Sequence, residues 1–131
     1  MCPAPIDDAD LSDFDQYQIN VRAPYALKQA LPPMLRMRQG EIVFINSSSG
    51  LTAKPMTAQY DSTKHALEAI ADSSQGEINR HGVRVLRDGG TRYQPELLLQ
   101  PDDVASVVIN ALSLPRTVEV TDVSIWPMIK S

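Results

Sequence analysis

The residues of this 131-residue chain with the clearest chemical potential are a tyrosine and a lysine four positions apart, Tyr60 and Lys64. In a helix, this spacing puts both side chains on one face. A free phenol titrates at about 10, and a lysine one turn away supplies positive charge that favours the phenolate. By itself the pair occurs by chance in roughly one chain in four of this length. A surface tyrosine beside a solvated lysine is therefore an alternative interpretation of the pair alone.

The stretch before this pair predicts the elements that would position it. Residues 42–45 form an apolar run that is typical of a short strand buried on both faces of a parallel sheet. Serines 47–49 follow the strand, and a helix is expected from about Thr57 to His81, with Gly82 as its C-terminal stop. Open α/β sheets place their active sites at the carboxyl ends of the strands. The serines and the pair are therefore expected to face each other.

The remaining elements are predicted on both sides of this unit. A helix is expected from the region of Ser12 to about Met37, bent or interrupted at Pro24 and at Pro32–Pro33. Two more strands are expected at residues 83–86 and 118–125. Between them, a helix should begin at Pro101 and stop before Pro115. The length is that of one domain.

Composition excludes several classes of function. The net charge is −4 and no basic run is present, so the sequence gives no support for nucleic-acid binding. No apolar run approaches the roughly 18 residues of a membrane span, and the acidic N-terminus does not read as a signal peptide. The single cysteine, Cys2, excludes an intramolecular disulfide, and neither histidine has a partner at metal-ligand spacing. We therefore expect a cytoplasmic protein with no metal site.

Two further residues complete a recognisable set. Ser47 lies 13 positions before Tyr60, and Asn20 lies 27 positions before Ser47. Together these residues resemble the short-chain dehydrogenase/reductase family. The matching segments are INVRAPYALKQALPPM, GEIVFINSSSG, QYDSTKHALEAIA and INRHGVRVL. They cover roughly residues 11–86, with weaker likeness to about Met128. The resemblance implies an α/β fold, a Rossmann-like three-layer α/β/α arrangement with a parallel sheet. Residues 1–131 would be a single partial domain that supplies its last three strands and long helices.

The resemblance also implies a chemistry. Members of the family transfer hydride between the nicotinamide of NAD or NADP and a small carbonyl or alcohol substrate. The catalytic set implied for this chain is Asn20, Ser47, Tyr60 and Lys64, with Tyr60 and Lys64 also binding the cofactor. Tyr60 would move the proton, and Ser47 would hydrogen-bond the substrate oxygen. Asn20 would widen its helix and anchor a water that connects Lys64 to solvent.

The sequence also departs from the family pattern. None of the glycines at positions 40, 50, 76, 82, 89 and 90 forms the glycine-rich turn that receives a dinucleotide pyrophosphate. The loop that covers the substrate in family members is expected to be absent between Leu86 and Arg87. Either the protein is truncated, or the sequence is part of a longer chain. The alternatives to an oxidoreductase are a non-catalytic remnant or one part of a split enzyme. The resemblance also implies a homodimer or homotetramer that forms through the two long helices.

Overall fold

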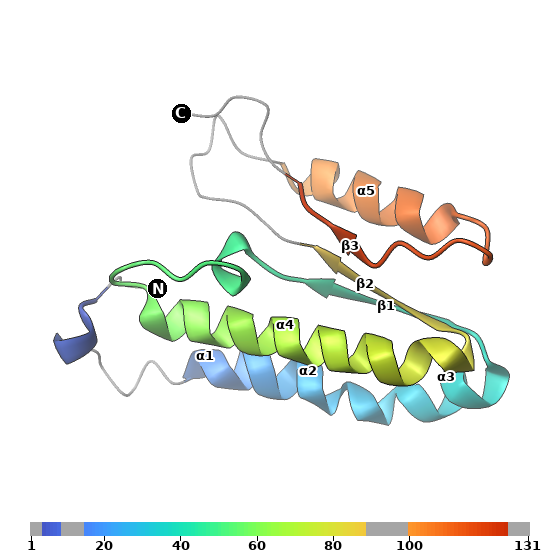
Figure 1. Ribbon diagram of the computed structural model, residues 1–131, viewed down its shortest axis with the longest axis horizontal. Helices are drawn as coiled ribbons and strands as arrows, with labels where there is room; N and C mark the ends of the chain where they lie inside the picture. The colour runs from blue at the N-terminus through green and yellow to red at the C-terminus, as the bar shows by residue number, and fades with distance from the viewer. Residues whose placement is uncertain (1–3, 9–14, 89–99, 126–131) are drawn as a thin grey trace.

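The computed structural model describes residues 4–8, 15–88 and 100–125, which form a parallel three-stranded sheet with helices on both faces (Figure 1). The sheet order is β1-β2-β3, and the first two strands pair over their whole length, from Gly40↔Val83 to Ile45↔Asp88. The strands are β1 (Gly40–Ile45), β2 (Val83–Asp88) and β3 (Asp122–Val123). Helix α4 (Ala58–Ile78) joins β1 to β2, and α5 (Pro101–Ser113) lies across the opposite side of the sheet (Figure 1). The predicted three-layer α/β fold is confirmed.

The core lies between α4 and one face of the sheet. Leu67, Ala71 and Ile78 recur at helical spacing and are buried along α4. Alternate strand residues face them, because successive side chains of a strand point to opposite faces. These strand residues are Ile42, Phe44, Val83 and Val85. The apolar face of α4 and the apolar face of the strands therefore pack against each other in one layer.

The other face of β1 is less covered than the sequence predicts. Val43 is half-buried and Ile45 is 51% exposed, so β1 is not buried on both faces within the described residues. The C-terminal end of helix α5 is held to β2 by Arg84, and Ala111 and Leu112 line a pocket together with Leu86. Because β1 is the edge strand of the described sheet, α5 covers it less completely than it covers β2.

The N-terminal helical stretch runs beside α4 and is interrupted, as predicted near the prolines (Figure 1). The last part of this stretch, α3, begins one residue before Pro32. The predicted start of the whole stretch, near Ser12, lies outside the described residues. Proline at a first helical turn is tolerated because the N–H there has no helical partner. In order, the stretch consists of α1 (Asp15–Tyr17), a π-helical turn (Gln18–Arg22), α2 (Ala23–Tyr25), a 3₁₀ turn (Ala26–Gln29) and α3 (Leu31–Met37). Further 3₁₀ turns cover Ile6–Asp8, Ser48–Gly50 and Asn79–His81.

Gly82 ends the α4 unit as the sequence predicts. Helix α4 stops at Ile78, and the 3₁₀ turn that follows ends at Gly82 in the left-handed region, with φ of 81°. A β-carbon at this position would lie 2.5 Å from the backbone oxygen of Arg38. Both the backbone conformation and the close approach therefore require glycine.

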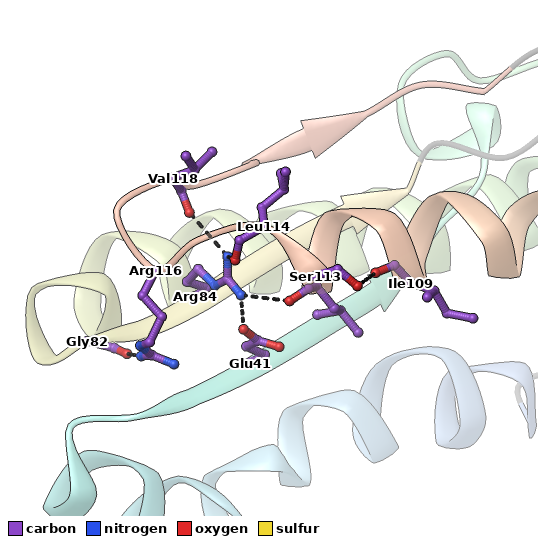
Figure 2. A network of polar contacts seen from close by, with 9 residues as sticks. Glu41, Gly82, Arg84, Ile109, Ser113, Leu114, Arg116 and Val118 are labelled. Carbon is purple, nitrogen blue, oxygen red and sulfur yellow. Dashed lines mark hydrogen bonds and ion pairs between the residues drawn. The ribbon is translucent and has the colours of Figure 1, made fainter.

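The last strand is shorter than predicted, and a side chain explains where its hydrogen bonds go. Within the predicted range 118–125, only Asp122–Val123 pairs with β2. Upstream, the carbonyl oxygen of Val118 accepts a hydrogen bond from Arg84 Nη1 at 3.2 Å (Figure 2). Arg84 also donates to the carbonyl oxygens of Leu112 and Leu114 and forms an ion pair with Glu41. The guanidinium thus fixes the C-terminal end of α5 on the sheet, in the place of ladder hydrogen bonds.

Strand β2 also corrects one detail of the sequence interpretation. Arg87 and Asp88 were expected to lie on the far side of a shortened loop. Instead they extend β2, where they pair with Phe44 and Ile45 of β1. The alternation of Val83, Val85 and Arg87 on one face continues the strand period through this point.

Candidate active site

The candidate site is built around the carboxyl end of β1, where the chain turns toward α4. Ser47 is 9% exposed and has extended backbone, and its hydroxyl accepts a hydrogen bond from the Ser49 amide at 3.2 Å. The Gly50 amide donates to the Ser47 carbonyl at 2.8 Å, which closes a tight 3₁₀ turn. A β-carbon on Gly50 would lie 2.9 Å from the Lys64 carbonyl oxygen, so the turn rests directly on α4.

Tyr60 and Lys64 share one face of α4, as their spacing predicts. Both side chains are half-buried, and the Lys64 ammonium nitrogen lies 5.7 Å from the centroid of the Tyr60 ring. Burial lowers the pKa of Lys64 below its usual value, because desolvation penalises the charged form. Among the described residues Lys64 forms no ion pair. Within that part of the chain, its charge is therefore not neutralised by a carboxylate.

Asn20 lies in the π-helical turn Gln18–Arg22, where the helix is widened as the resemblance implied. The Ala23 amide bonds the Gln18 carbonyl, five residues back. Pro24 has no N–H, so the ordinary helical bond to the Asn20 carbonyl cannot form. The Asn20 side chain donates from Nδ2 to Thr63 Oγ1 at 3.1 Å. This contact attaches the widened turn to α4 at the residue before Lys64.

Asp61 is the most deeply buried carboxylate near the site, and the sequence interpretation missed it. It is 1% exposed, and its Oδ2 accepts from the Lys54 amide and from the Thr57 hydroxyl, each at 2.7 Å. Burial alone would raise its pKa. The hydrogen bonds from Thr57 and Lys54, the nearby Ser49 hydroxyl and the charge of Lys54 outweigh burial, and the pKa lies below the usual value. Asp61 therefore holds the loop between β1 and α4 as an anion.

A second missed group joins the strand ends to α4. Asn46, 7% exposed, donates from Nδ2 to Glu68 Oε2 at 2.7 Å and to the Lys64 carbonyl at 3.3 Å. Glu68 also forms an ion pair with Arg87, which bonds Asp72 Oδ1 at 2.6 Å. Glu68 and Asp72 continue the four-residue steps of the Tyr60–Lys64 pair along the same helix face. That continuation was the sequence signal for them.

The four predicted residues thus gather around the first two turns of α4. Tyr60 and Lys64 are in mutual contact, and the Ser47 turn lies against the Lys64 carbonyl. Asn20 is held by a hydrogen bond to Thr63, and none of the hydrogen bonds among the described residues joins Asn20 to Lys64. Their catalytic roles stay predictions. Across the described residues there is no cluster of three or more metal-binding side chains, and no helix there is long and apolar enough to cross a membrane.

Comparison with known proteins identifies the family and supports the fold. A family model described as short chain dehydrogenase matches residues 1–87. An uncharacterized oxidoreductase of Staphylococcus aureus is 28% identical over 140 aligned positions, which cover 98% of this chain and 61% of the relative. The alignment is longer than this chain, so the relative carries residues inside the matched region that this chain lacks. The chain spans less than two thirds of the length of that relative.

Solved structures give the same result. A metagenomic short-chain oxidoreductase in complex with NADP superposes with a TM-score of 0.83 at 26% identity, over 96% of this chain and 57% of that one. Serine dehydrogenase from Escherichia coli superposes with a TM-score of 0.89 over the whole chain and 61% of that enzyme. At 22% identity, the second similarity concerns the fold alone.

Proposed function

This chain belongs to the short chain dehydrogenase family, and we propose that it carries the proton-transfer half of an NAD(P)-dependent oxidoreductase site for a small carbonyl or alcohol substrate. The observation that carries the proposal is the Tyr60–Lys64 pair. It combines a half-buried phenol with a desolvated ammonium group 5.7 Å from its ring, next to a buried serine turn. Such a pair is suited to moving one proton at the phenol oxygen.

The residues present fit a nicotinamide cofactor. Lys64 has no acidic partner among the described residues, so its ammonium protons remain available to ribose hydroxyls, and Tyr60 lies beside it. When bound, NAD or NADP supplies or accepts the hydride. The chain's own residues do the rest. Tyr60 gives a proton to the substrate oxygen or takes one from it, Lys64 places an ammonium group beside the phenol, and Ser47 holds the substrate oxygen.

Asn20 would complete a path for the proton. The bond from residue 24 to the Asn20 carbonyl cannot form because Pro24 has no N–H, and an accepting oxygen of this kind suits a water. The π-helical turn is also a local irregularity of the kind found at functional sites. A water there would carry protons between Lys64 and solvent.

A phenylalanine substitution tests the proposal. Tyr60→Phe should lower turnover by a factor of at least about 100 and leave the affinity for NADPH or NADH nearly unchanged. Turnover is followed by nicotinamide absorbance with a panel of small ketones and alcohols, and affinity by nicotinamide fluorescence. Tyr25→Phe is the matched control, because it removes only the hydroxyl of a side chain that is 68% exposed on α2 and keeps the ring, so turnover should not change. Full turnover in Tyr60→Phe would refute the assignment.

A second candidate function is a non-catalytic remnant or one part of a split enzyme. It is favoured by the edge position of β1 and by two apolar side chains near it, Ile45 and Leu51, which are 51% and 56% exposed. An edge strand with apolar neighbours needs a partner to cover it. Intact mass and co-purification separate the cases, since a second polypeptide bound in fixed ratio would favour the split enzyme.

We also propose a homodimer or homotetramer through the two long helices. A surface other than the β1 edge supports this proposal. Ile19 and Tyr25, both in the N-terminal helical stretch, are 74% and 68% exposed. Apolar side chains at such exposure favour a helical dimer interface. Light scattering gives the assembly mass, and a monomer at all concentrations would contradict this proposal.

A further inference from the structure

A group of hydrogen-bonded polar side chains lies next to the candidate site. Proton transfer at Tyr60 does not by itself require these bonds. Asn46 comes immediately before Ser47, and its side-chain amide reaches α4. Its Nδ2 has two acceptors, the Lys64 carbonyl and Glu68 Oε2, so the orientation of the amide is fixed by its partners. One side chain thereby joins the residue that precedes Ser47 to the backbone of Lys64.

Glu68 is held from the opposite side by β2. Arg87 donates from Nη1 to Glu68 Oε1, while Asn46 donates to Glu68 Oε2. The side chains of Arg87 and Glu68 are 15% and 21% exposed, so water competes weakly for these bonds. A carboxylate with one donor on each oxygen cannot rotate without losing one of them. The carboxyl ends of β1 and β2 are therefore connected through a single group on α4.

The packing leaves the turn little freedom to shift. A β-carbon on Gly50 would lie 2.6 Å from Asn46 Nδ2 and 2.9 Å from the Lys64 carbonyl oxygen. The turn, the Asn46 amide and the α4 backbone therefore meet at contact distance. A small displacement of Asn46 would move Ser47 relative to Lys64, because nothing compressible lies between them.

We propose that Asn46, Glu68 and Arg87 are positioning residues that set the place of the Ser47 turn relative to Tyr60 and Lys64. The inference rests on the proposed function for its effect on turnover. The anchoring of the turn itself is independent of that function. Asn46 needs an amide and not merely a side chain of its size, because both of its partners are acceptors.

Hydrogen exchange tests the anchoring without any activity. The Ser49 and Gly50 amides bond within the Ser47 turn, so their protection from exchange reports its persistence. Asn46→Ala should lower both protection factors by about tenfold. Asp72→Asn is the matched control, since Asp72 contacts Arg87 but not Asn46, and protection there should stay within about twofold. Unchanged protection in Asn46→Ala would overturn the proposal.

A charged variant separates positioning from simple filling of space. Asn46→Asp has nearly the same volume, but its carboxylate would face Glu68 and the Lys64 carbonyl. Protection at neutral pH should then fall at least as far as in Asn46→Ala. It should recover as the pH is lowered and a proton is shared between the two carboxyl groups. Protection that is equal to wild type at neutral pH, or that does not respond to pH, would refute the role of the amide.

Turnover then separates the two proposals. In an active wild type, Asn46→Ala should lower kcat by about tenfold or more, with the Kd for NADPH or NADH nearly unchanged. An unchanged kcat would refute positioning while leaving the function intact. If the wild type has no turnover but protection falls in Asn46→Ala, the proposed function fails and the anchoring stands.

Discussion

Replacement of the buried carboxylate Asp61 by an amide should weaken the fold at neutral pH. The structure allows the magnitude to be worked out. Asp61 accepts two hydrogen bonds at 2.7 Å from Lys54 and Thr57, and hydrogen bonds to a charged group contribute about 1.5–3 kcal/mol each. Asp61→Asn keeps one oxygen and buries an amide more cheaply than a carboxylate, which offsets part of the loss. We expect a net decrease of about 2 kcal/mol in the free energy of unfolding.

The decrease is measured by urea unfolding followed by circular dichroism. With a typical dependence on denaturant of about 1–3 kcal/mol per molar urea, the midpoint should fall by about 1 M. Glu77→Gln is the control, because the exposed Glu77 carboxylate accepts a single hydrogen bond from the described residues, that of Ser73 at 3.1 Å. Its midpoint should change little.

The pH dependence gives a second, independent test. The pKa of Asp61 is lowered by folding, so its contribution is fully present above the unfolded value of 3.8 and is lost as the pH falls through the lower folded value. The midpoints of wild type and Asp61→Asn should therefore converge in acid, below pH 3.8. Equal midpoints at pH 7, or a gap that persists unchanged into acid, would refute the reasoning.

Three further substitutions have defined outcomes. Burial lowers the pKa of Lys64 in the folded state, so the unfolded state binds the proton more readily and the stability of the wild type rises as the pH rises toward 10.5. In urea titrations, any stability advantage of Lys64→Met should therefore shrink over that range. Arg84→Met leaves Glu41 without its ion-pair partner and should cost about 3 kcal/mol in the same assay, with early hydrogen exchange in α5. Gly82→Ala puts a β-carbon 2.5 Å from the Arg38 backbone oxygen at positive φ, and should lower the thermal midpoint by several degrees, equivalent to about 2 kcal/mol.

The sequence predicted the sheet, the two long helical stretches and the grouping of Tyr60 with Lys64, because each depends on local period or spacing. The stop at Gly82 was predictable for the same reason, since only the residues around it determine a left-handed cap. The widening of the helix at Asn20 followed from the resemblance. Pro24, four residues later, gives it a local physical cause.

The errors concern elements whose state depends on distant partners. Residues 42–45 are all apolar, but the cover over each face of β1 depends on where α5 docks, and Ile45 remains exposed. The short β3 depends on Arg84, whose side chain takes the Val118 carbonyl from 34 positions away. Asn46 and Glu68 were missed because their bond joins residues 22 positions apart, and neither residue type is unusual at its place.

The first turns of α4 show why these contacts matter together. Successive helix residues turn by about 100°, so Asp61 and Thr63 flank the Tyr60–Lys64 face, one on each side. Asp61 holds the loop after the serine turn, and Thr63 holds the Asn20 side chain of the π-helical turn. One helical segment therefore orients the loop and the widened turn around the pair that would do the chemistry. Substitution of Asp61 or Thr63 should alter the geometry of the site without touching Tyr60 or Lys64. Their effects on turnover should therefore follow the loss of these anchors and not a change in the reacting groups.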